Sequence, residues 1–480
     1  MYSLPVFEFR YFCSIMEVLK PYIPWLALIT GFIITYLSVP AIVRLSLVKR
    51  LYDEPDDRKL HGRRITALGG VAIFAGVFFA FVFFSAYLPN PALNSIVLAM
   101  GILFVTGIKD DLFPLVPFKK FLGQLIAILI VAIQGNVRIV ALYDLYDTYN
   151  ILPYWLSIIF TVIFFVVIIN SFNFIDGING LLSSIVLVIC SVYAFFFFKM
   201  ESALFLILAM SICGALLAFL RYNLFNAKIF MGDSGSLVLG FLVAVLTIYF
   251  IQRANEYEPN IFYNIHGMVF AFSVLIIPIL DSIRVVFIRV FIKRTSPFSA
   301  DRNHIHHALL DIGLTHFQAT LTLTLANLGI VYLSWLLNES NVLAKEQLVI
   351  IFGVGIALSQ IPFFIKKSPK KKRVKQYFSL LYFLTFAACS VTQNNIQNEP
   401  GNSTQSSHVT ISKADPNTAY LGNWQLLKLD GAPFVATPVL QRKQPNNPAA
   451  MSPVAASASI QFNSAPMVTS MPQPGATDCL

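Results

Sequence analysis

The stretch at 170–181 reads Asn170-Ser-Phe-Asn173-Phe-Ile-Asp176-Gly177-Ile-Asn179-Gly180-Leu181 and separates two long apolar runs, 153–170 and 181–198. Amides and a carboxylate beside an apolar layer cost free energy unless they are paired or functional. Three of them, Asn170, Asn173 and Asp176, recur every third residue and therefore share one face of a helix end. The pattern fits either a hydrogen-bonded helix cap and turn or a functional site at a membrane face.

The composition predicts an all-α polytopic membrane protein. Of 480 residues, 57% are hydrophobic, 14% are aromatic and only 12% are charged, against about 25% charged residues in soluble domains. The formal net charge of +10 does not indicate a nucleic-acid partner, because the basic residues gather between the apolar runs. Five scattered cysteines show no metal-ligand spacing, so a cysteine zinc site is not indicated.

Apolar stretches that approach or reach the length needed to cross about 30 Å of hydrocarbon predict eleven transmembrane helices. They lie at 24–44, 68–88, 93–108, 120–136, 153–170, 181–198, 202–220, 235–251, 266–281, 318–337 and 347–365. The ninth contains Pro278 and continues into Asp281 and Arg284. We expect this helix to leave the membrane and run on as an amphipathic extension.

The loops between these helices differ sharply in basic residues. Alternate loops, beginning with 45–67 and counting the adjoining helix ends, hold 24 of the 34 Lys and Arg residues. The opposite set holds four, namely Arg138, Lys199, Arg253 and Lys345. Cytoplasmic loops carry the excess of Lys and Arg, so we expect the first set to be cytoplasmic and the N-terminus to be outside.

The polar stretches all fall in the basic set. They are 53–64, 110–111, 170–181, 231–236 and 301–307. Structural polar residues without a shared role would be expected on both faces of the membrane. Their one-sided placement predicts a cytoplasmic active site built from loops on a rigid helical scaffold.

Carboxylates occur at two predicted helix ends. Asp110 and Asp111 follow Lys109 at the end of the third helix, and Asp233 opens the eighth helix within Phe-Met-Gly-Asp-Ser-Gly-Ser at 230–236. Adjacent carboxylates can simply be solvated, and Asp233 can act only as a helix cap. The functional alternative is a divalent-cation or general-base site, since hard oxygen ligands suit magnesium bound to substrate phosphates.

Four of the seven histidines lie within 304–316, after Arg302. A zinc site and a solvated turn are alternatives, but the cysteines are distant and the loop is basic. Arg and His beside a metal–phosphate centre favour anion recognition.

Together these stretches resemble the polyprenyl-phosphate N-acetylhexosamine-1-phosphate transferases, the WecA-type branch of the superfamily that also contains the muramyl-pentapeptide transferases. The resemblance covers about residues 20–365. Its motifs, in order, are Asp53-x-Pro55-x-x-Arg58-Lys59-x-His61, Gly69-Gly70, Asp110-Asp111, Asn170-x-x-Asn173-x-x-Asp176-Gly177, the 230–236 stretch and Asp301-Arg302-x-His304-Ile305-His306-His307.

The resemblance implies transfer of N-acetylhexosamine 1-phosphate from a UDP-sugar to undecaprenyl phosphate, with UMP released and Mg²⁺, or Mn²⁺ in its place, as cofactor. The setting it implies is the bacterial cytoplasmic (inner) membrane, at the first membrane step of envelope polysaccharide synthesis such as O-antigen. A homodimer is compatible with it. Muramyl-pentapeptide transfer and lipid or solute transport are the alternatives. Transport fits less well, because the helix centres are nearly bare of charge.

The same resemblance implies residue roles. Asp110, with Asp111 beside it, would orient or deprotonate the acceptor phosphate, and Asp176 would complete the catalytic set. Asp233 and Asp111 would hold the metal. The implied substrate-binding residues are Lys59, His61, Asn173, Asn179, Arg302, His304, His306 and His307.

Two positions bear on the choice within the superfamily. Many relatives have a second Asp where this chain has Asn179, and the amide lacks the charge of a carboxylate, which disfavours a direct metal role there. His-Ile-His-His at 304–307, in place of three consecutive histidines, favours the sugar-phosphate branch over the muramyl-pentapeptide branch.

The tail is expected to be separate from the membrane domain, 1–365. Residues 366–389 combine a basic run with a short apolar segment that ends at Cys389 and resembles a lipoprotein signal. The favoured alternative is a short re-entrant or twelfth apolar segment without processing. If this segment crosses the membrane, the tail is periplasmic. Residues 390–480 predict a polar, mostly disordered or weakly β tail, with a faint META-like stretch at 421–431.

Overall fold

The computed structural model describes residues 20–51, 65–86, 88, 90–141, 151–256, 266–296, 303–340 and 342–367. Over these ranges the fold is helical, and the β-type pairs are two isolated bridges, Thr66–Ile229 and Ala141–Ile151. The predicted site residues Lys59, His61 and Arg302 lie outside the described residues, as do the lipoprotein-signal-like segment and the polar tail.

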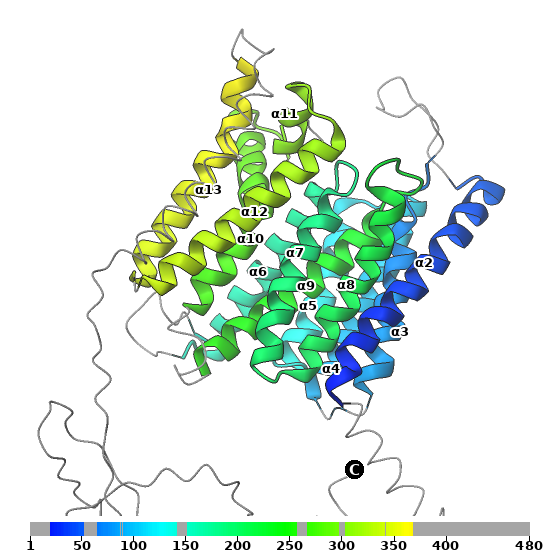
Figure 1. Ribbon diagram of the computed structural model, residues 1–480, viewed down its shortest axis with the longest axis horizontal. Coiled ribbons are helices and arrows are strands. Elements are labelled where there is room, and N and C mark those ends of the chain that lie inside the picture. The colour runs from blue at the N-terminus through cyan, green and yellow to red at the C-terminus, as the bar shows by residue number, and fades with distance from the viewer. Residues whose placement is uncertain are drawn as a thin grey trace, which may run out of the picture. The chain divides into compact units, whose positions relative to one another are not determined.

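Each of the eleven predicted apolar segments corresponds to one long helix, and the predicted and observed ends differ by a few residues (Figure 1). The long helices are α2 (Ile23–Lys49), α3 (Gly69–Ser85), α4 (Pro91–Leu112), α5 (Pro117–Ile133), α6 (Tyr154–Ile175), α7 (Leu181–Lys199), α8 (Ala203–Asn223), α9 (Asp233–Glu256), α10 (Gly267–Phe287), α12 (His316–Glu339) and α13 (Ala344–Lys367). Shorter turns are η1 (Lys20–Tyr22), the π-helical η3 (Ile288–Ile292) and α11 (Ile305–Asp311). The prediction that the ninth apolar helix continues past 281 is confirmed, since α10 runs directly into η3.

Within the described ranges, nine helices are long and apolar enough to cross a membrane. The remaining two, α3 and α5, have 17 residues each, or about 25 Å at 1.5 Å per residue. In α9, 94% of the most apolar window is buried, whereas the value is 22% in α2 and in α13. Apolar helices with so little burial need lipid around them, so the all-α polytopic membrane fold is confirmed.

Local chemistry defines several helix ends. Asn90 accepts a hydrogen bond from the Ala92 amide at 2.9 Å and caps α4, which begins at Pro91. Thr315 and Gln318 form a reciprocal capping box at the start of α12. Gly180 has φ +73°, a left-handed conformation that glycine adopts without strain, and it allows the sharp turn into α7.

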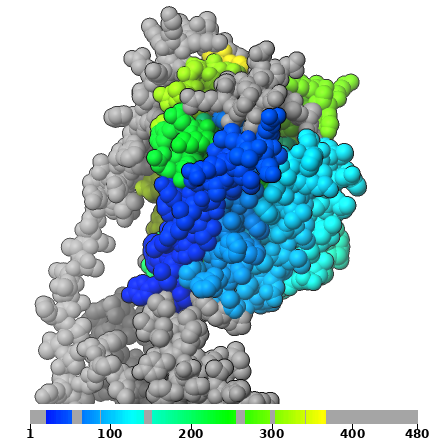
Figure 2. Space-filling model, turned by 90° about the vertical axis from the view of Figure 1, so that its right-hand side faces the viewer, coloured from blue at the N-terminus to red at the C-terminus, as the bar shows by residue number. Residues whose placement is uncertain are grey.

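The central helix α9 packs against α3, α4, α6, α7 and α10, while α2 packs against α3 and α8 on one flank (Figures 1 and 2). The short helix α11 contacts α12 and α13. Because successive long helices alternate in direction, the C-terminal ends of α4, α6 and α10 and the N-terminal ends of α5, α7 and α9 lie at one end of the bundle. The polar stretches at 110–111, 170–181, 231–236 and 303–307 therefore gather at that end.

Candidate active site

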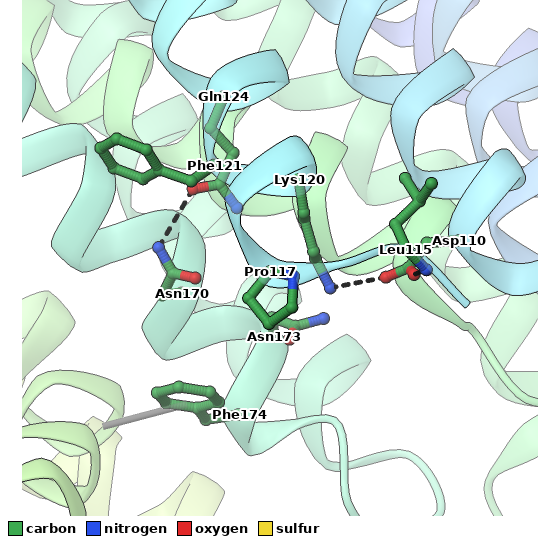
Figure 3. Close-up of a pocket in the computed structure, with 9 residues that line it drawn as sticks. All are labelled: Asp110, Leu115, Pro117, Lys120, Phe121, Gln124, Asn170, Asn173 and Phe174. Atoms are coloured by element: carbon green, nitrogen blue, oxygen red, sulfur yellow. Dashed lines mark hydrogen bonds and ion pairs between the residues drawn. The ribbon is translucent and has the colours of Figure 1, made fainter. Parts of the chain in front are cut away.

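Two carboxylates and one ammonium group meet where α4, α5 and α9 come together. The Lys120 Nζ lies 3.1 Å from Asp110 Oδ2 and 2.5 Å from Asp233 Oδ2, and Figure 3 shows its side chain directed at Asp110. Asp110 and Asp233 also lie within hydrogen-bonding reach of each other. The Leu115 amide, just after α4, donates to Asp110 Oδ1 at 2.6 Å and holds that carboxylate in place. Lys120 thus offsets part of the repulsion between two close acids.

Asp111 faces the start of α9, whereas the adjacent Asp110 faces Lys120. The Asp111 Oδ1 accepts from the Asp233 amide at 2.6 Å and the Asp111 Oδ2 from the Ser234 amide at 3.0 Å. These are the first two amides of α9, which have no carbonyl partner within their own helix. Asp111 therefore caps α9 from outside and fixes the point at which Asp233 enters the site.

The stretch at 170–181 contributes two groups to the same centre. Asn173 donates through Nδ2 to Asp233 Oδ1 and, at 2.9 Å, to Ser236 Oγ. Asp176 follows α6 and accepts a hydrogen bond from the Gly232 amide. Burial, together with the negative charges of Asp233 and Asp111, raises the pKa of Asp176 to about 7. Asp176 is therefore poised between its two protonation states near neutral pH.

Glycines allow this close approach of backbones. A Cβ on Gly107 would lie 2.5 Å from Ser234 Cα, so α4 and the start of α9 could not pack as they do with any larger residue. Gly232 has φ +75°, and its Cβ would lie 2.7 Å from Asp111 Oδ1. The Met-Gly-Asp stretch thus turns sharply into α9 directly against Asp111.

A buried amide joins the two loops that carry these residues. Asn223, at the end of α8, accepts from the Gly180 amide at 2.6 Å and donates to the Ile229 carbonyl at 2.8 Å. On the other side, Thr320 of α12 donates to the Asn179 carbonyl at 2.8 Å. The Asn179 residue is only 7% exposed, so it lies in the packed turn between α6 and α7.

Beside the carboxylates is a cavity of about 160 Å³. It has a polar end, formed by Asp110, Lys120 and Asn173, and a more apolar wall (Figure 3). The remaining lining residues are Leu115, Pro117, Phe121, Gln124, Asn170 and Phe174. Asn170 donates to Gln124 Oε1 at 3.1 Å and to the Val166 carbonyl at 2.8 Å, so its side chain lines this cavity and bonds to Gln124 and the α6 backbone.

The donor set fits a hard divalent cation. Asp233 and Asp176 interact electrostatically, and Asp110 lies in reach of Asp233, so carboxylate oxygens converge from three helix ends. Mg²⁺ and Mn²⁺ prefer such oxygen ligands, and Mg²⁺ usually takes one or two carboxylates together with substrate phosphates. Both oxygens of Asp111 accept hydrogen bonds from backbone amides of α9, whereas those of Asp233 contact the side chains of Asn173 and Lys120. A cation bound by Asp233 would therefore displace side-chain contacts and leave the start of α9 intact.

The histidine segment lies against the turn that follows α6. A Cβ on Gly177 would clash with the His306 ring, so the absence of a side chain at 177 makes room for this imidazole. The residue His306 is 1% exposed, and burial lowers its pKa to about 3, which keeps the ring neutral. The ring of His307 lies 4.3 Å from that of His306, between centroids.

The structure brings together Asp110, Asp111, Asn173, Asp176 and Asp233, and it places His306 next to Gly177. Sequence reasoning missed two charged residues. Lys120 was visible only as one of several basic loop residues, and Asp281 was interpreted as part of an amphipathic extension. Two signals in the sequence point to these residues. One is a lysine in the first turn of a helix beside two predicted acid stretches, and the other is a lone Asp at the end of an apolar run.

Comparison with known proteins identifies the family of this chain. The family model described as glycosyl transferase family 4 matches residues 93–251, which include all five of the acids and amides just named. The chain is similar to a probable undecaprenyl-phosphate N-acetylglucosaminyl 1-phosphate transferase of Bacillus subtilis, with 31% identity over 304 residues, 62% of this chain and 81% of the relative.

Two other relatives are similar over comparable lengths. An undecaprenyl-phosphate alpha-N-acetylglucosaminyl 1-phosphate transferase of Escherichia coli O157:H7 is 27% identical over 69% of this chain and 88% of its own length. A decaprenyl-phosphate N-acetylglucosaminephosphotransferase of Mycolicibacterium smegmatis is 30% identical over 62% of this chain and 78% of its own. The chain therefore belongs to glycosyl transferase family 4, in its branch of polyprenyl-phosphate N-acetylhexosamine-1-phosphate transferases.

Proposed function

We propose that this protein transfers N-acetylhexosamine 1-phosphate from a UDP-sugar to undecaprenyl phosphate, forming undecaprenyl-pyrophosphoryl sugar and UMP. The observation that carries the proposal is the Lys120 ammonium bridging Asp110 and Asp233 at the polar end of a cavity in an apolar helix bundle. A lipid phosphate and a nucleotide diphosphate are both anionic, so their reaction needs cationic groups and carboxylate-bound metal at a membrane face.

On the donor side, Asp233 and Asp176 would hold Mg²⁺. Bound Mg²⁺ would neutralise charge on the diphosphate and stabilise the UMP that leaves. The chain's own contribution is geometry. Asp111 fixes the backbone at Asp233, and Asn173 orients its carboxylate through Oδ1. Neutral His306, against Gly177 beside Asp176, would contact the donor's phosphate or sugar by hydrogen bonding.

On the acceptor side, the cavity lined by Lys120 is too small for a whole nucleotide-sugar. At about 160 Å³ it falls below the ~300–1,000 Å³ of pockets that enclose drug-sized ligands, but it suits a phosphate and the first carbons of its lipid. Along α5, Phe118, Leu122 and Ile126 form an adjacent exposed apolar stripe, at 70%, 45% and 45% exposure. The prenyl chain would lie along this stripe in the lipid phase.

In the reaction, an oxygen of the acceptor phosphate forms a bond to the phosphorus that carries the sugar. The bond from that phosphorus to the oxygen shared with the uridylyl phosphate breaks, and UMP leaves with the electron pair. Asp110 would orient the acceptor phosphate or take its remaining proton, while Lys120 shields the negative charge of the approaching group. The same residues are compatible with a direct transfer or with an intermediate on an aspartate.

We further propose that the site faces the cytoplasm of a bacterial inner membrane, where nucleotide-sugars are made, and that the product starts an envelope polysaccharide. The Lys and Arg excess in the loops at the site's end of the bundle supports this orientation. UDP-N-acetylglucosamine is the first donor to test, because the relatives carry names of N-acetylglucosaminyl 1-phosphate transferases.

The test uses membranes that contain the full-length protein, with MgCl₂, undecaprenyl phosphate and one donor from a panel of UDP-sugars that includes UDP-N-acetylmuramoyl-pentapeptide. We expect UMP release with UDP-N-acetylglucosamine or a related N-acetylhexosamine, dependent on both the lipid and Mg²⁺. Asp233→Ala should abolish release. Asp311→Asn serves as the control, because the exposed Asp311 carboxylate pairs with Lys366 away from the candidate site. If none of the UDP-sugars in the panel gives Mg²⁺-dependent UMP release, the proposal is contradicted.

A further inference from the structure

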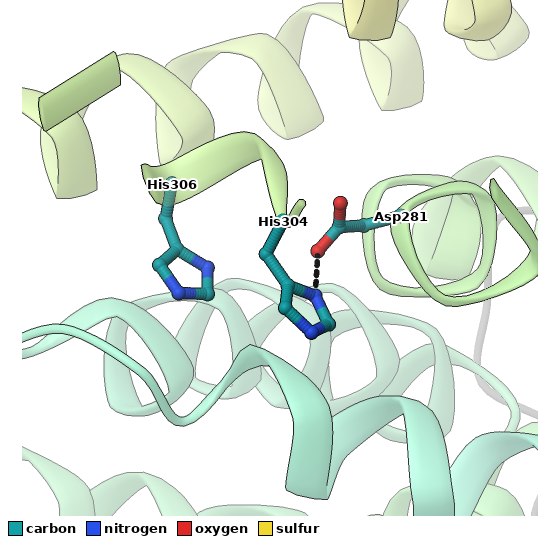
Figure 4. Close-up of side chains that lie close together, drawn as sticks. All are labelled: Asp281, His304 and His306. Atoms are coloured by element: carbon teal, nitrogen blue, oxygen red, sulfur yellow. Dashed lines mark hydrogen bonds and ion pairs between the residues drawn. The ribbon is translucent and has the colours of Figure 1, made fainter. Parts of the chain in front are cut away.

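A buried carboxylate lies beneath the histidine segment and makes contacts on both of its oxygens. Asp281 of α10 is 2% exposed. Its Oδ2 lies 2.9 Å from His304 Nδ1, and its Oδ1 accepts from the Ile305 amide, the first of α11, at 2.8 Å (Figure 4). Asp281 therefore joins α10 to the start of the histidine helix through one ring and one backbone amide.

The other nitrogen of His304 fixes which ring atom carries the proton. The Arg289 Nη2 lies 3.5 Å from His304 Nε2, and its guanidinium stacks over the Phe174 ring of α6 at 5.2 Å. The Arg289 guanidinium only donates and the Asp281 carboxylate only accepts, so the two contacts together favour a proton on Nδ1 and a lone pair on Nε2. His304 is thus held between a carboxylate and a guanidinium in one tautomer.

His306 depends on this arrangement for its position. Its ring stacks on His304 at 5.4 Å between centroids with an interplanar angle of 12°. The Nε2 and Cε1 atoms of the ring lie against Gly177. Among the described residues, neither ring nitrogen of His306 has a hydrogen-bond partner. A buried imidazole without partners is costly unless a ligand supplies them, so His306 is available to substrate at a place that His304 sets.

We propose that Asp281 is a positioning residue for donor binding. It holds His304 in its Nδ1–H form and accepts a hydrogen bond from the first amide of α11. These two contacts place His306 beside the turn at Asp176 and Gly177. The inference rests on the proposed function, since it assigns His306 to the UDP-sugar of that reaction. Asp281 itself need not touch substrate.

A metal ion held by Asp281, His304 and His306 is the competing interpretation, because their ligand atoms lie within 4.8 Å of one another. Charge disfavours it. Arg284 Nη2 lies 3.7 Å from Asp281 Oδ1, and Arg289 adds a second guanidinium on the far side of His304. Both oxygens of Asp281 are also engaged already. A cation would have to enter between two fixed positive groups.

Asp281→Asn in the full-length protein tests whether Asp281 positions His306 for donor binding or only stabilises the fold. The introduced amide keeps the size and one oxygen for the Ile305 amide, but its NH₂ group faces His304 Nδ1 and forces the proton to Nε2, toward Arg289. We expect the KM for UDP-N-acetylglucosamine to rise by about 10- to 100-fold, while the KM for undecaprenyl phosphate stays within about twofold of wild type. The thermal midpoint in detergent should be nearly unchanged, and Asp311→Asn is the matched carboxylate-to-amide control.

A spectroscopic readout tests the arrangement without turnover. In protein labelled with ¹⁵N in the histidine rings, wild type should show His304 as the Nδ1–H tautomer, assigned by its loss in His304→Gln, and Asp281→Asn should reverse it. If wild type releases no UMP, the proposed function fails, yet this measurement still decides the tautomer.

Three results would overturn the inference. They are an Nε2–H tautomer in wild type, an equal rise of both KM values together with a fall in thermal stability, and a stoichiometric transition metal, measured by mass spectrometry, that Asp281→Asn removes.

Discussion

At the scale of single residues, the site depends on an imbalance of charge. Asp110, Asp111, Asp176 and Asp233 gather at one end of the bundle, and Lys120 bridges two of them. Acids placed this close repel each other unless a cation stands between them. The excess of negative charge therefore favours cation binding, and the proposed reaction between two phosphorylated substrates needs such a cation.

Lys120→Gln removes the bridging ammonium while keeping a polar chain of similar length. We expect the rate of UMP release to fall by about 100-fold or more, because the charge facing both carboxylates and the acceptor phosphate is lost. Lys119→Gln is the matched control, since the neighbouring Lys119 is exposed, and it should leave the rate within about twofold. Equal activity of the two variants would remove Lys120 from the mechanism.

The raised pKa of Asp176, about 7, predicts how cation binding depends on pH. Below that pH the folded protein holds a proton on Asp176 that a cation must displace, and above it the carboxylate is free. The Mg²⁺ concentration for half-maximal activity should fall as pH rises from about 5.5 to 7.5, by up to about tenfold per unit below the pKa. Asp176→Asn should flatten this dependence in the UMP assay.

The sign of the linked stability effect is opposite. Asp176 has a folded-state pKa above its ordinary value of 3.8, so the metal-free folded state binds the proton more tightly than the unfolded state does. Its contribution to stability is present below about pH 4 and is lost as pH rises through about 7. Thermal unfolding in EDTA across that window would reveal a loss that Mg²⁺ reverses.

At the scale of elements, helix termini position the chemistry. Asp233 is the first residue of α9, Asp110 lies in the last turn of α4 and Asp176 follows α6. Backbone amides fix these positions: the Leu115 amide donates to Asp110, and the first two amides of α9 donate to Asp111. Rigid helices thus carry the site, and the short loops between them are tied by buried amides such as Asn223.

Asn223→Ala should loosen two of these loops together. It removes the partners of the Gly180 amide and the Ile229 carbonyl, both in buried surroundings, at a cost of about 1–3 kcal/mol for each group left unsatisfied. We expect a lower thermal midpoint in detergent and a reduced rate. Asn226→Ala, an exposed position in the same loop, should change neither. An unchanged midpoint for Asn223→Ala would show that the loops are held by other contacts.

At the scale of the whole molecule, the bundle places every described polar stretch at one end, where the loops are rich in Lys and Arg. Its outward helices, among them α2 and α13, remain apolar and little buried. This combination supports the proposed reaction, in which a lipid would reach the site from the membrane and a nucleotide-sugar from the aqueous phase.

Two lysines at opposite ends of the bundle test the orientation. Lys228→Cys lies at the site's end and Lys199→Cys at the other, and both positions are exposed. In a background with Cys13, Cys389 and Cys479 replaced by serine, a membrane-impermeant maleimide should label position 199 from outside spheroplasts. Position 228 should be labelled only after the membrane is opened. The reverse pattern would place the site in the periplasm.

The sequence predicts the helices more completely than it predicts the contacts within the site. Runs of apolar residues predicted all eleven long helices, because the length of an apolar segment is a local property that the membrane thickness constrains. The predicted boundary at 365 lies two residues before the observed end of α13 at Lys367. The acids were found because carboxylates at the ends of apolar runs are conspicuous.

The sequence by itself determined the membrane class, the helices and the set of polar stretches that share one end of the bundle. Only the tertiary structure decided that Lys120 bridges Asp110 and Asp233, that Asp111 caps α9, and that Asp281 holds His304. The reason is physical: hydrophobicity is summed along consecutive residues, whereas a hydrogen bond or ion pair depends on distances of a few ångströms between residues far apart in the chain.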